Sequence, residues 1–124
     1  MEHEISDLAF EVRCQVVSAV AMAWQVSGHM PTFVDEPDQM AQHLALVSVD
    51  SMKRIEAVLY EVPDEPIWQE LAEIEPAEEW TMCVLIPLSG VGRAHERLRG
   101  TGCTVQGWWA NDEGSIEFGS TQIA

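Results

Sequence analysis

The segment from Ser6 to Val26 constrains the fold most, because its apolar residues cover most of a helix's circumference. Ser6 or Asp7 can cap the start of this helix, and Gly28 followed by Pro31 ends it. Wound at about 100° per residue, the segment keeps one narrow polar strip. That strip consists of Glu11, Gln15, Ser18 and Gln25, and Met22 interrupts it. We expect such a helix to be central in its domain or covered by another subunit.

The next segment, Pro37 to Val62, is predicted to be mainly helical. Pro37 suits the first turn of a helix, and Pro63 ends the region. Apolar residues recur at helical spacing, namely Met40, Leu44, Val47, Met52, Ile55, Leu59 and Val62. The middle stays open, since Leu44 to Val49 also fits a short strand, but two helices or one bent helix are favoured.

The chain changes character after Trp80, where β-forming residues become frequent. Thr81 to Leu88 is apolar on both alternating faces, which is typical of an interior strand. The other predicted elements are helices over Ile67–Glu75 and Val91–Arg99, and strands over Cys103–Trp109 and Ser115–Phe118 joined by the turn Ala110–Gly114. We therefore predict a single α+β domain over residues 1–124. In it an N-terminal helical layer of two to three helices packs on a small C-terminal β-α-β-β sheet.

The charge balance limits the partners. The chain has 21 acidic residues against 6 Lys and Arg, a formal net charge of −15. This field repels phosphates, so direct binding to nucleic acid or to a membrane surface is not expected. Three explanations of the acidic excess stay open: solubility, attraction of a basic protein partner, and mimicry of nucleic acid.

The acidic residues are also unevenly distributed, because no Lys or Arg lies between Ile55 and Gly92. The candidate partner-binding residues of this acidic segment are Glu61, Asp64, Glu65, Trp68, Glu70 and Glu73. Trp68 either pins the segment to the domain or anchors a partner. A small basic patch follows, formed by Arg93, Arg97 and Arg99. It can attract the acidic segment within one chain or between two.

The cysteines and the start of the chain indicate a compartment. Cys14, Cys83 and Cys103 show no CxxC spacing, and their odd number fits reduced thiols better than a disulfide frame. Met1–Glu4 is acidic where a secretory signal is basic, and the weakly polar run Gln15–Val26 is too short to span a bilayer. We expect a cytoplasmic protein.

A glycine-containing turn is the most suggestive candidate for ligand binding. Gly90 and Gly92 lie between a predicted strand and a predicted helix, where backbone N–H groups can approach an anion. Arg93 adds donors for phosphate or carboxylate. A tight β–α turn is the alternative explanation, since neither GxxxxGK[ST] nor GxGxxG is present.

The stretch Gly90-Val91-Gly92-Arg93-Ala94, with Asn111 and Ile116-Glu117-Phe118, is faintly similar to the acyl-CoA-binding segment of GNAT-type acetyltransferases. In that family a strand leads through a Gly-x-Gly loop into a helix, and the loop amides hold a pyrophosphate. The similarity covers about a third of the chain, and Pro87 stands where the family carries Gln or Arg. We interpret it as shared turn chemistry.

His95 and Trp108 complete the candidate ligand site. His95 lies on the helix face that turns toward the sheet, as a structural histidine or as a group in a pocket beside the glycine turn. Trp108 points away from Trp109, so it is covered by its own chain or marks a partner or ligand surface. No metal site, cofactor, base or nucleophile is predicted: the histidines form no HxxxH pair, and Ser89 lacks a GxSxG elbow.

Two classes of function are favoured. The first is a non-catalytic interaction protein of inhibitor, immunity or adaptor type that binds a basic partner through its acidic surface, as a homo-oligomer and most simply a dimer. The second is a small-molecule-binding domain with a pocket between helices and sheet, near Trp108, His95 and Gly90–Arg93. An enzyme ranks third, because no residue pattern assigns a reaction.

Overall fold

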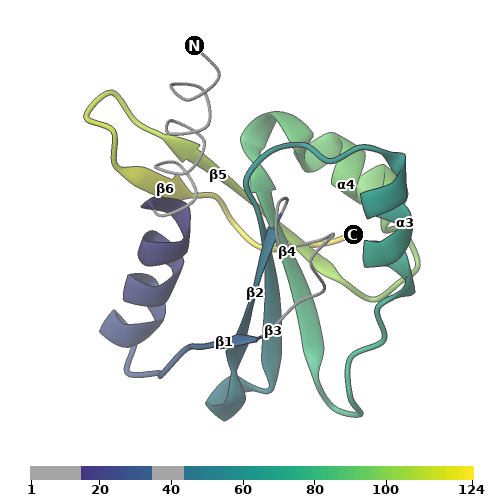
Figure 1. The fold of residues 1–124 in the computed structure, drawn as a ribbon, viewed down its shortest axis with the longest axis horizontal. Helices are drawn as coiled ribbons and strands as arrows, with labels where there is room; N and C mark the ends of the chain where they lie inside the picture. The colour runs from purple at the N-terminus through teal and green to yellow at the C-terminus, as the bar shows by residue number, and fades with distance from the viewer. Residues whose placement is uncertain (1–14, 35–43) are drawn as a thin grey trace.

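The computed structural model describes residues 15–34 and 44–124, which are built around one sheet (Figure 1). A helix spans residues 15–26. The strands are β1 (Thr32–Val34), β2 (Leu44–Val49), β3 (Arg54–Leu59), β4 (Thr81–Pro87), β5 (Thr104–Ala110), β6 (Ile116–Phe118) and β7 (Gln122–Ile123). The connecting segments include the helices α3 (Glu65–Glu73) and α4 (Val91–Arg97) and the 3-10 turns η1 (Asp50–Met52) and η2 (Leu88–Gly90). No helix in this part of the chain is long and apolar enough to cross a membrane.

The seven strands form a mixed sheet in the order β1-β2-β3-β4-β5-β6, with β7 also paired to β5. β1, β2 and β3 are antiparallel neighbours, whereas β3, β4 and β5 are parallel. β6 and β7 return antiparallel to β5. α3 links β3 to β4 and α4 links β4 to β5, as parallel neighbours require a crossover. Both crossovers advance the sheet in the same direction, so α3 and α4 cover the same face (Figure 1).

Each face of the sheet carries its own apolar cluster. On one face, Trp68 and Leu71 of α3 and Ala94 of α4 pack on side chains of β2 to β5. On the other, the helix of residues 15–26 places Val16 and Val20 on residues of β2 to β5. Figure 1 shows this helix, in purple, on the opposite side of the sheet from α3 and α4. β4, between the two clusters, is buried along nearly its whole length.

The predicted N-terminal helical layer on a small C-terminal sheet is wrong, because strands β2 and β3 lie within the segment from Pro37 to Val62 and belong to the same sheet as β4 and β5. The physical reason is burial on both faces. Leu44 belongs to the cluster under α3, and Val47 to the cluster on the opposite face. Apolar residues that fill both faces of a strand also satisfy a helical spacing, so their periodicity does not separate the two structures.

The turn between β2 and β3 gives no sequence signal either. Lys53 takes the left-handed conformation, with φ of 50°, at a position where Gly or Asn is the usual residue. The predicted helix start at Ser6, the thiol of Cys14, and Pro37 and Met40 lie outside the described residues.

From α3 onward the observed elements follow the predicted ones closely. α3, β4, α4, β5 and β6 each overlap their predicted range, and the ends differ by a few residues at most. The ends of these segments are marked by residues that break helices and strands. Prolines or glycines flank the helices, and the β5–β6 turn contains Asn111 and Gly114. In that turn the Asn111 side-chain Oδ1 accepts hydrogen bonds from the backbone N–H groups of Glu113 and Ser115.

Gly90 and Gly92 differ in their surroundings, which predicts opposite effects of substitution by alanine. A Cβ at Gly90 lies 2.7 Å from Val62 Cγ2 and 2.8 Å from Ile86 Cδ1, whereas one at Gly92 meets nothing within 4 Å. We expect Gly90→Ala to lower the free energy of unfolding by about 1–3 kcal/mol through overpacking. Gly92→Ala, within α4, is expected to raise it by up to about 1 kcal/mol. Urea unfolding of both variants tests this, and equal effects contradict the packing role of Gly90.

Candidate functional site

A pocket of about 250 Å³ lies between the helix of residues 15–26 and the sheet. The helix and the turn after it contribute one wall, and β3, β4, β5 and the β6 region contribute the other. The lining residues are Val20, Ala23, Trp24, Ser27, Arg54, Glu56, Leu85, Gln106, Phe118 and Thr121. The pocket is therefore mixed in character, with apolar and polar side chains in equal number, and its convergent polar groups can orient a small molecule.

The alternation of β3 places two charged residues on the pocket side of the sheet. Arg54 and Glu56 are two positions apart, so their side chains leave the same face of the strand. In the lateral register, Glu56 lies beside Cys83 of β4, which in turn lies beside Thr104 of β5. Only 2% of Glu56 is exposed, so a carboxylate sits at the base of the pocket within the sheet.

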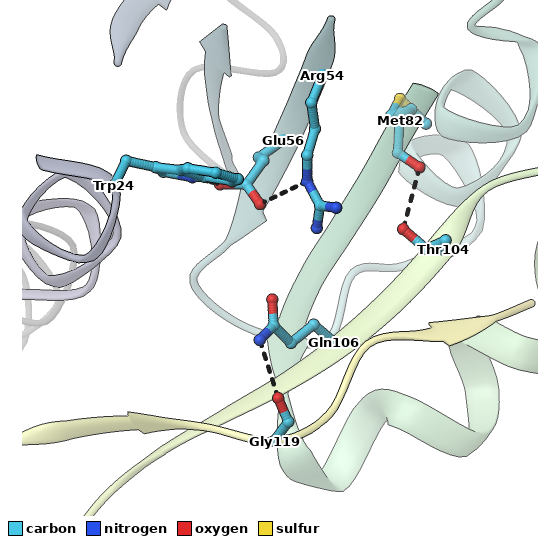
Figure 2. A network of polar contacts seen from close by, with 7 residues as sticks. All are labelled: Trp24, Arg54, Glu56, Met82, Thr104, Gln106 and Gly119. Atoms are coloured by element: carbon cyan, nitrogen blue, oxygen red, sulfur yellow. Dashed lines mark hydrogen bonds and ion pairs between the residues drawn. The ribbon is translucent and has the colours of Figure 1, made fainter. Parts of the chain in front are cut away.

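Both oxygens of the Glu56 carboxylate have a donor. Trp24 Nε1 donates to Oε1 at 2.5 Å, and Arg54 Nε donates to Oε2 at 3.1 Å (Figure 2). The Arg54 guanidinium carbon also lies 5.7 Å from the centroid of the Trp24 ring, at the distance of a cation–π contact. A buried carboxylate is stable only with such partners, so this network is the polar link between helix and sheet.

A second set of contacts fixes the end of the helix. The rings of Trp24 and His29 meet edge to face, with centroids 5.7 Å apart and an interplanar angle of 80°. His29 Nδ1 is hydrogen-bonded to the Ser51 hydroxyl of η1 at 2.7 Å. The indole of Trp24 is thus held by Glu56, Arg54 and His29, which gives this wall of the pocket a defined position.

The orientation of the Gln106 amide follows from its hydrogen bond. Its Nε2 donates to the Gly119 carbonyl oxygen at 2.8 Å, and a carbonyl oxygen accepts only from a donor, so the amide nitrogen must face Gly119. The Gln106 oxygen therefore points the other way. Figure 2 shows it directed toward the space between Trp24 and Arg54. Arg54 donates to Glu56 through Nε, and its hydrogen bond to the Cys83 thiol acts to lower the pKa of that thiol. The Arg54 guanidinium and the Gln106 oxygen both belong to residues that line the pocket, the first as a donor and the second as an acceptor.

The Cys83 thiol on the pocket side of the sheet is not an activated nucleophile. Burial raises the pKa of the Cys83 thiol from 9.0 to about 11, although the positive charge of Arg54 acts in the opposite direction. The thiol is thus protonated at neutral pH and unreactive. Among residues 15–34 and 44–124, no group of three or more His, Cys, Asp or Glu side chains is arranged to hold a metal ion.

The structure separates the residues that were expected to form one ligand site. Gly90 packs under Val62 and Ile86. Arg93 Nη2 lies 3.4 Å from Glu65 Oε1, and His95 Nε2 is hydrogen-bonded to Gln122 Oε1 at 3.0 Å. These residues belong to the side of the sheet covered by α3 and α4.

Trp108 lies on the opposite face, in the cluster beneath the helix of residues 15–26. It is 7% exposed, and its Nε1 donates to the Leu59 carbonyl oxygen at 2.9 Å. Of the two explanations for this residue, coverage by its own chain is the one that the structure supports. The two-sided β4 is likewise covered within the chain, so neither feature now argues for a dimer.

The acidic segment is partly neutralised within the chain. Glu65 forms ion pairs with both Arg93 and Arg97, so the basic patch meets the acidic segment intramolecularly. Trp68 is 1% exposed and belongs to the core, where it pins α3 to the sheet. The other candidate partner-binding residues lie along the surface of α3 and the loop before it: Glu61, Asp64 and Glu73 are exposed, and Glu70 is half-buried.

A scan against protein-family models, a search of curated proteins and a search of solved structures each find no match for this chain. The geometry of the pocket is therefore the basis for a functional interpretation.

The sequence contained a signal for this site that the helical interpretation concealed. Arg54-x-Glu56 is a charged pair at a spacing of two next to the apolar run Ala57–Leu59. In a strand such a pair shares one face, but in a helix the two residues point apart. No spacing in the sequence connects Gln106 or Trp24 to β3.

The Trp24–Glu56 hydrogen bond predicts a stability difference between two Trp→Phe variants. Trp24→Phe leaves Glu56 Oε1 without its donor and is expected to cost about 1.5–3 kcal/mol, as for a hydrogen bond to a charged group. Trp109→Phe removes an exposed bond of the same type, Nε1 to Glu117 Oε2 at 3.1 Å, and is expected to cost less than about 1 kcal/mol. Urea unfolding measures both, and a loss at Trp24 no larger than at Trp109 argues against the link.

The raised pKa of Cys83 predicts a loss of stability at alkaline pH. Between pH 9 and about 11 the unfolded thiol ionises while the folded thiol stays protonated, so the unfolded state binds fewer protons and the free energy of unfolding falls. Below pH 9 this contribution is constant. Cys83→Ala is expected to show a shallower decline than the native protein over this window, in urea unfolding at a series of pH values. Parallel profiles rule out a buried, protonated thiol.

Proposed function

We propose that this protein is a small-molecule-binding domain whose ligand occupies the pocket between the helix of residues 15–26 and the sheet. The observation that carries this proposal is the arrangement of Arg54, which lines the pocket and is fixed through Nε by the buried Glu56, so that its terminal nitrogens are further donors on the pocket side. A polar group held this firmly at the wall of a pocket is what gives a binding site its orientation and specificity.

The pair formed by buried Glu56 and half-buried Arg54 carries a desolvation cost, although Glu56 also links the helix to the sheet. Replacing a buried ion pair by apolar residues of similar volume is often neutral or stabilising, because both charges must be desolvated. β4 shows the apolar alternative in the same sheet, with Cys83 and Leu85 on the pocket side. The presence of Arg54 and Glu56 at this position, despite the desolvation cost, therefore supports a role in recognition.

The size of the pocket restricts the ligand. About 250 Å³ corresponds to roughly eight water volumes and lies below the common range of roughly 300–1,000 Å³ for ligand pockets. The site therefore suits a small molecule of one ring, or the ring portion of a larger compound that extends into solvent.

An acidic interaction surface is supported less well, because Trp68 is buried and Glu65 is already paired.

Filling the pocket from the helix tests the proposal. Ala23 lines the pocket, whereas its neighbour Met22 is 62% exposed and does not. We expect small ring-containing fragments, screened by saturation-transfer NMR, to bind the native protein and the Met22→Phe control. The Ala23→Phe variant is expected to lose binding, because the new ring takes the ligand's place.

Two results count against the proposal. One is the absence of any fragment that binds the native protein at millimolar concentration. The other is binding that Ala23→Phe leaves unchanged while urea unfolding shows this variant to be as stable as Met22→Phe. In the second case the fragments occupy another surface.

A further inference from the structure

Two polar side chains of the pocket have opposite hydrogen-bonding roles, because Arg54 is a donor and the Gln106 oxygen is an acceptor. The terminal nitrogens of Arg54 only donate, and the Gln106 oxygen only accepts. They come from β3 and β5, on either side of β4, with Arg54 in register with Thr81 and Gln106 in register with Leu85. Figure 2 shows the two side chains facing the same space. A ligand that satisfies both must carry an acceptor close to an N–H or O–H donor.

Charge decides which kind of acceptor fits. Glu56 already neutralises Arg54, since the carboxylate accepts from both Arg54 and Trp24. A ligand carboxylate or phosphate would place a second anion within a few ångströms of Glu56, in a partly desolvated site that shields the charges poorly. The net charge of −15 adds repulsion at longer range. A neutral carbonyl oxygen can accept from Arg54 without that cost.

Shape decides the rest of the ligand. The indole of Trp24 is seen edge-on in Figure 2, on the side of the space opposite Gln106, and Leu85 and Phe118 add apolar surface. Flat aromatic and aliphatic walls favour a planar ring, because planar faces make the most contact with them. The volume of about 250 Å³ limits that ring system to a single ring within the pocket.

We infer that the pocket recognises a neutral, planar heterocycle in which a carbonyl group stands next to an N–H, as in a cyclic amide or cyclic urea. The carbonyl oxygen accepts from the terminal nitrogens of Arg54, and the N–H donates to the Gln106 oxygen. Trp24 covers one face of the ring. This assignment rests on the proposed function, because it specifies the ligand class of the same pocket.

Three probes of similar size test the assignment on the native, isotope-labelled protein by NMR titration. 2-Pyridone carries the adjacent carbonyl and N–H, N-methyl-2-pyridone keeps the carbonyl but lacks the donor, and benzoate is an anion. We expect 2-pyridone to bind at the pocket, with shifts of the Trp24 indole and Gln106 amide signals. The affinity of N-methyl-2-pyridone is expected to be lower by about tenfold or more, since the Gln106 oxygen is left without a donor.

Matched variants assign the effect to the two groups. Gln106→Leu removes the acceptor and is expected to weaken 2-pyridone binding about tenfold while it abolishes the preference over the N-methyl compound. Arg54→Lys keeps the charge beside Glu56 but loses the fork of donors, and a similar loss is expected. Thr104→Val, on the same face of β5 but outside the pocket lining, is expected to change affinity by less than about twofold.

The outcomes separate the two proposals. Equal binding of 2-pyridone and its N-methyl analogue, or tighter binding of benzoate, overturns the ligand class and leaves the small-molecule function standing. Fragments that occupy the pocket while 2-pyridone does not also overturn the class alone. If no fragment binds in the pocket, both proposals fail. The comparison of the two pyridones uses the native protein, so it remains decisive if a variant does not fold.

Discussion

The carboxylate of Glu56 is the point on which the arrangement of the helix and the sheet depends. Apolar contacts through Val16 and Val20 hold the helix of residues 15–26 to the sheet but set no unique rotation or shift along it. The hydrogen bond from Trp24 to Glu56 connects residues 32 positions apart in the chain. It fixes both the rotation of the helix and its shift along the sheet. Because Arg54 binds the same carboxylate, the position of the helix and the direction of the guanidinium are determined together.

The two faces of the sheet are covered to different extents, and the pocket follows from this difference. α3 and α4 together close one face. Among the described residues, a single helix of about 10 Å diameter covers the other face, whereas the four strands β2 to β5, about 4.8 Å apart, span about 14 Å. The uncovered strip lies beside Trp24, where Leu85, Gln106 and Phe118 line the cavity. A recess of this kind is the geometric result of an unequal number of helices.

The sequence predicted the second half of the fold better than the first. Prolines and glycines mark the ends of α3, β4, α4 and β5, and the hairpin turn carries Asn111 and Gly114. β2 and β3 have no such marks, and their burial on both faces removes the alternation that identifies a strand. That error also concealed the site, because Arg54 and Glu56 share a face only in a strand. No local pattern relates Trp24 or Gln106 to this pair, since the four residues meet only through the tertiary structure.

The overall charge of the protein and the local chemistry of the pocket act at different ranges. The charge influences which molecules approach, and the pocket groups determine which of them fit. At physiological salt the acidic surface is screened beyond about 8 Å, so it influences which molecules approach more than which ones fit. Within the pocket, Arg54 faces Glu56 at contact distance and the pair is neutral. An anion is thus disfavoured on approach and gains little inside, whereas a neutral ring loses nothing on approach and meets both a donor and an acceptor. In the binding function that we propose, the acidic composition acts as a second filter beside the selection of the ligand by Arg54 and Gln106.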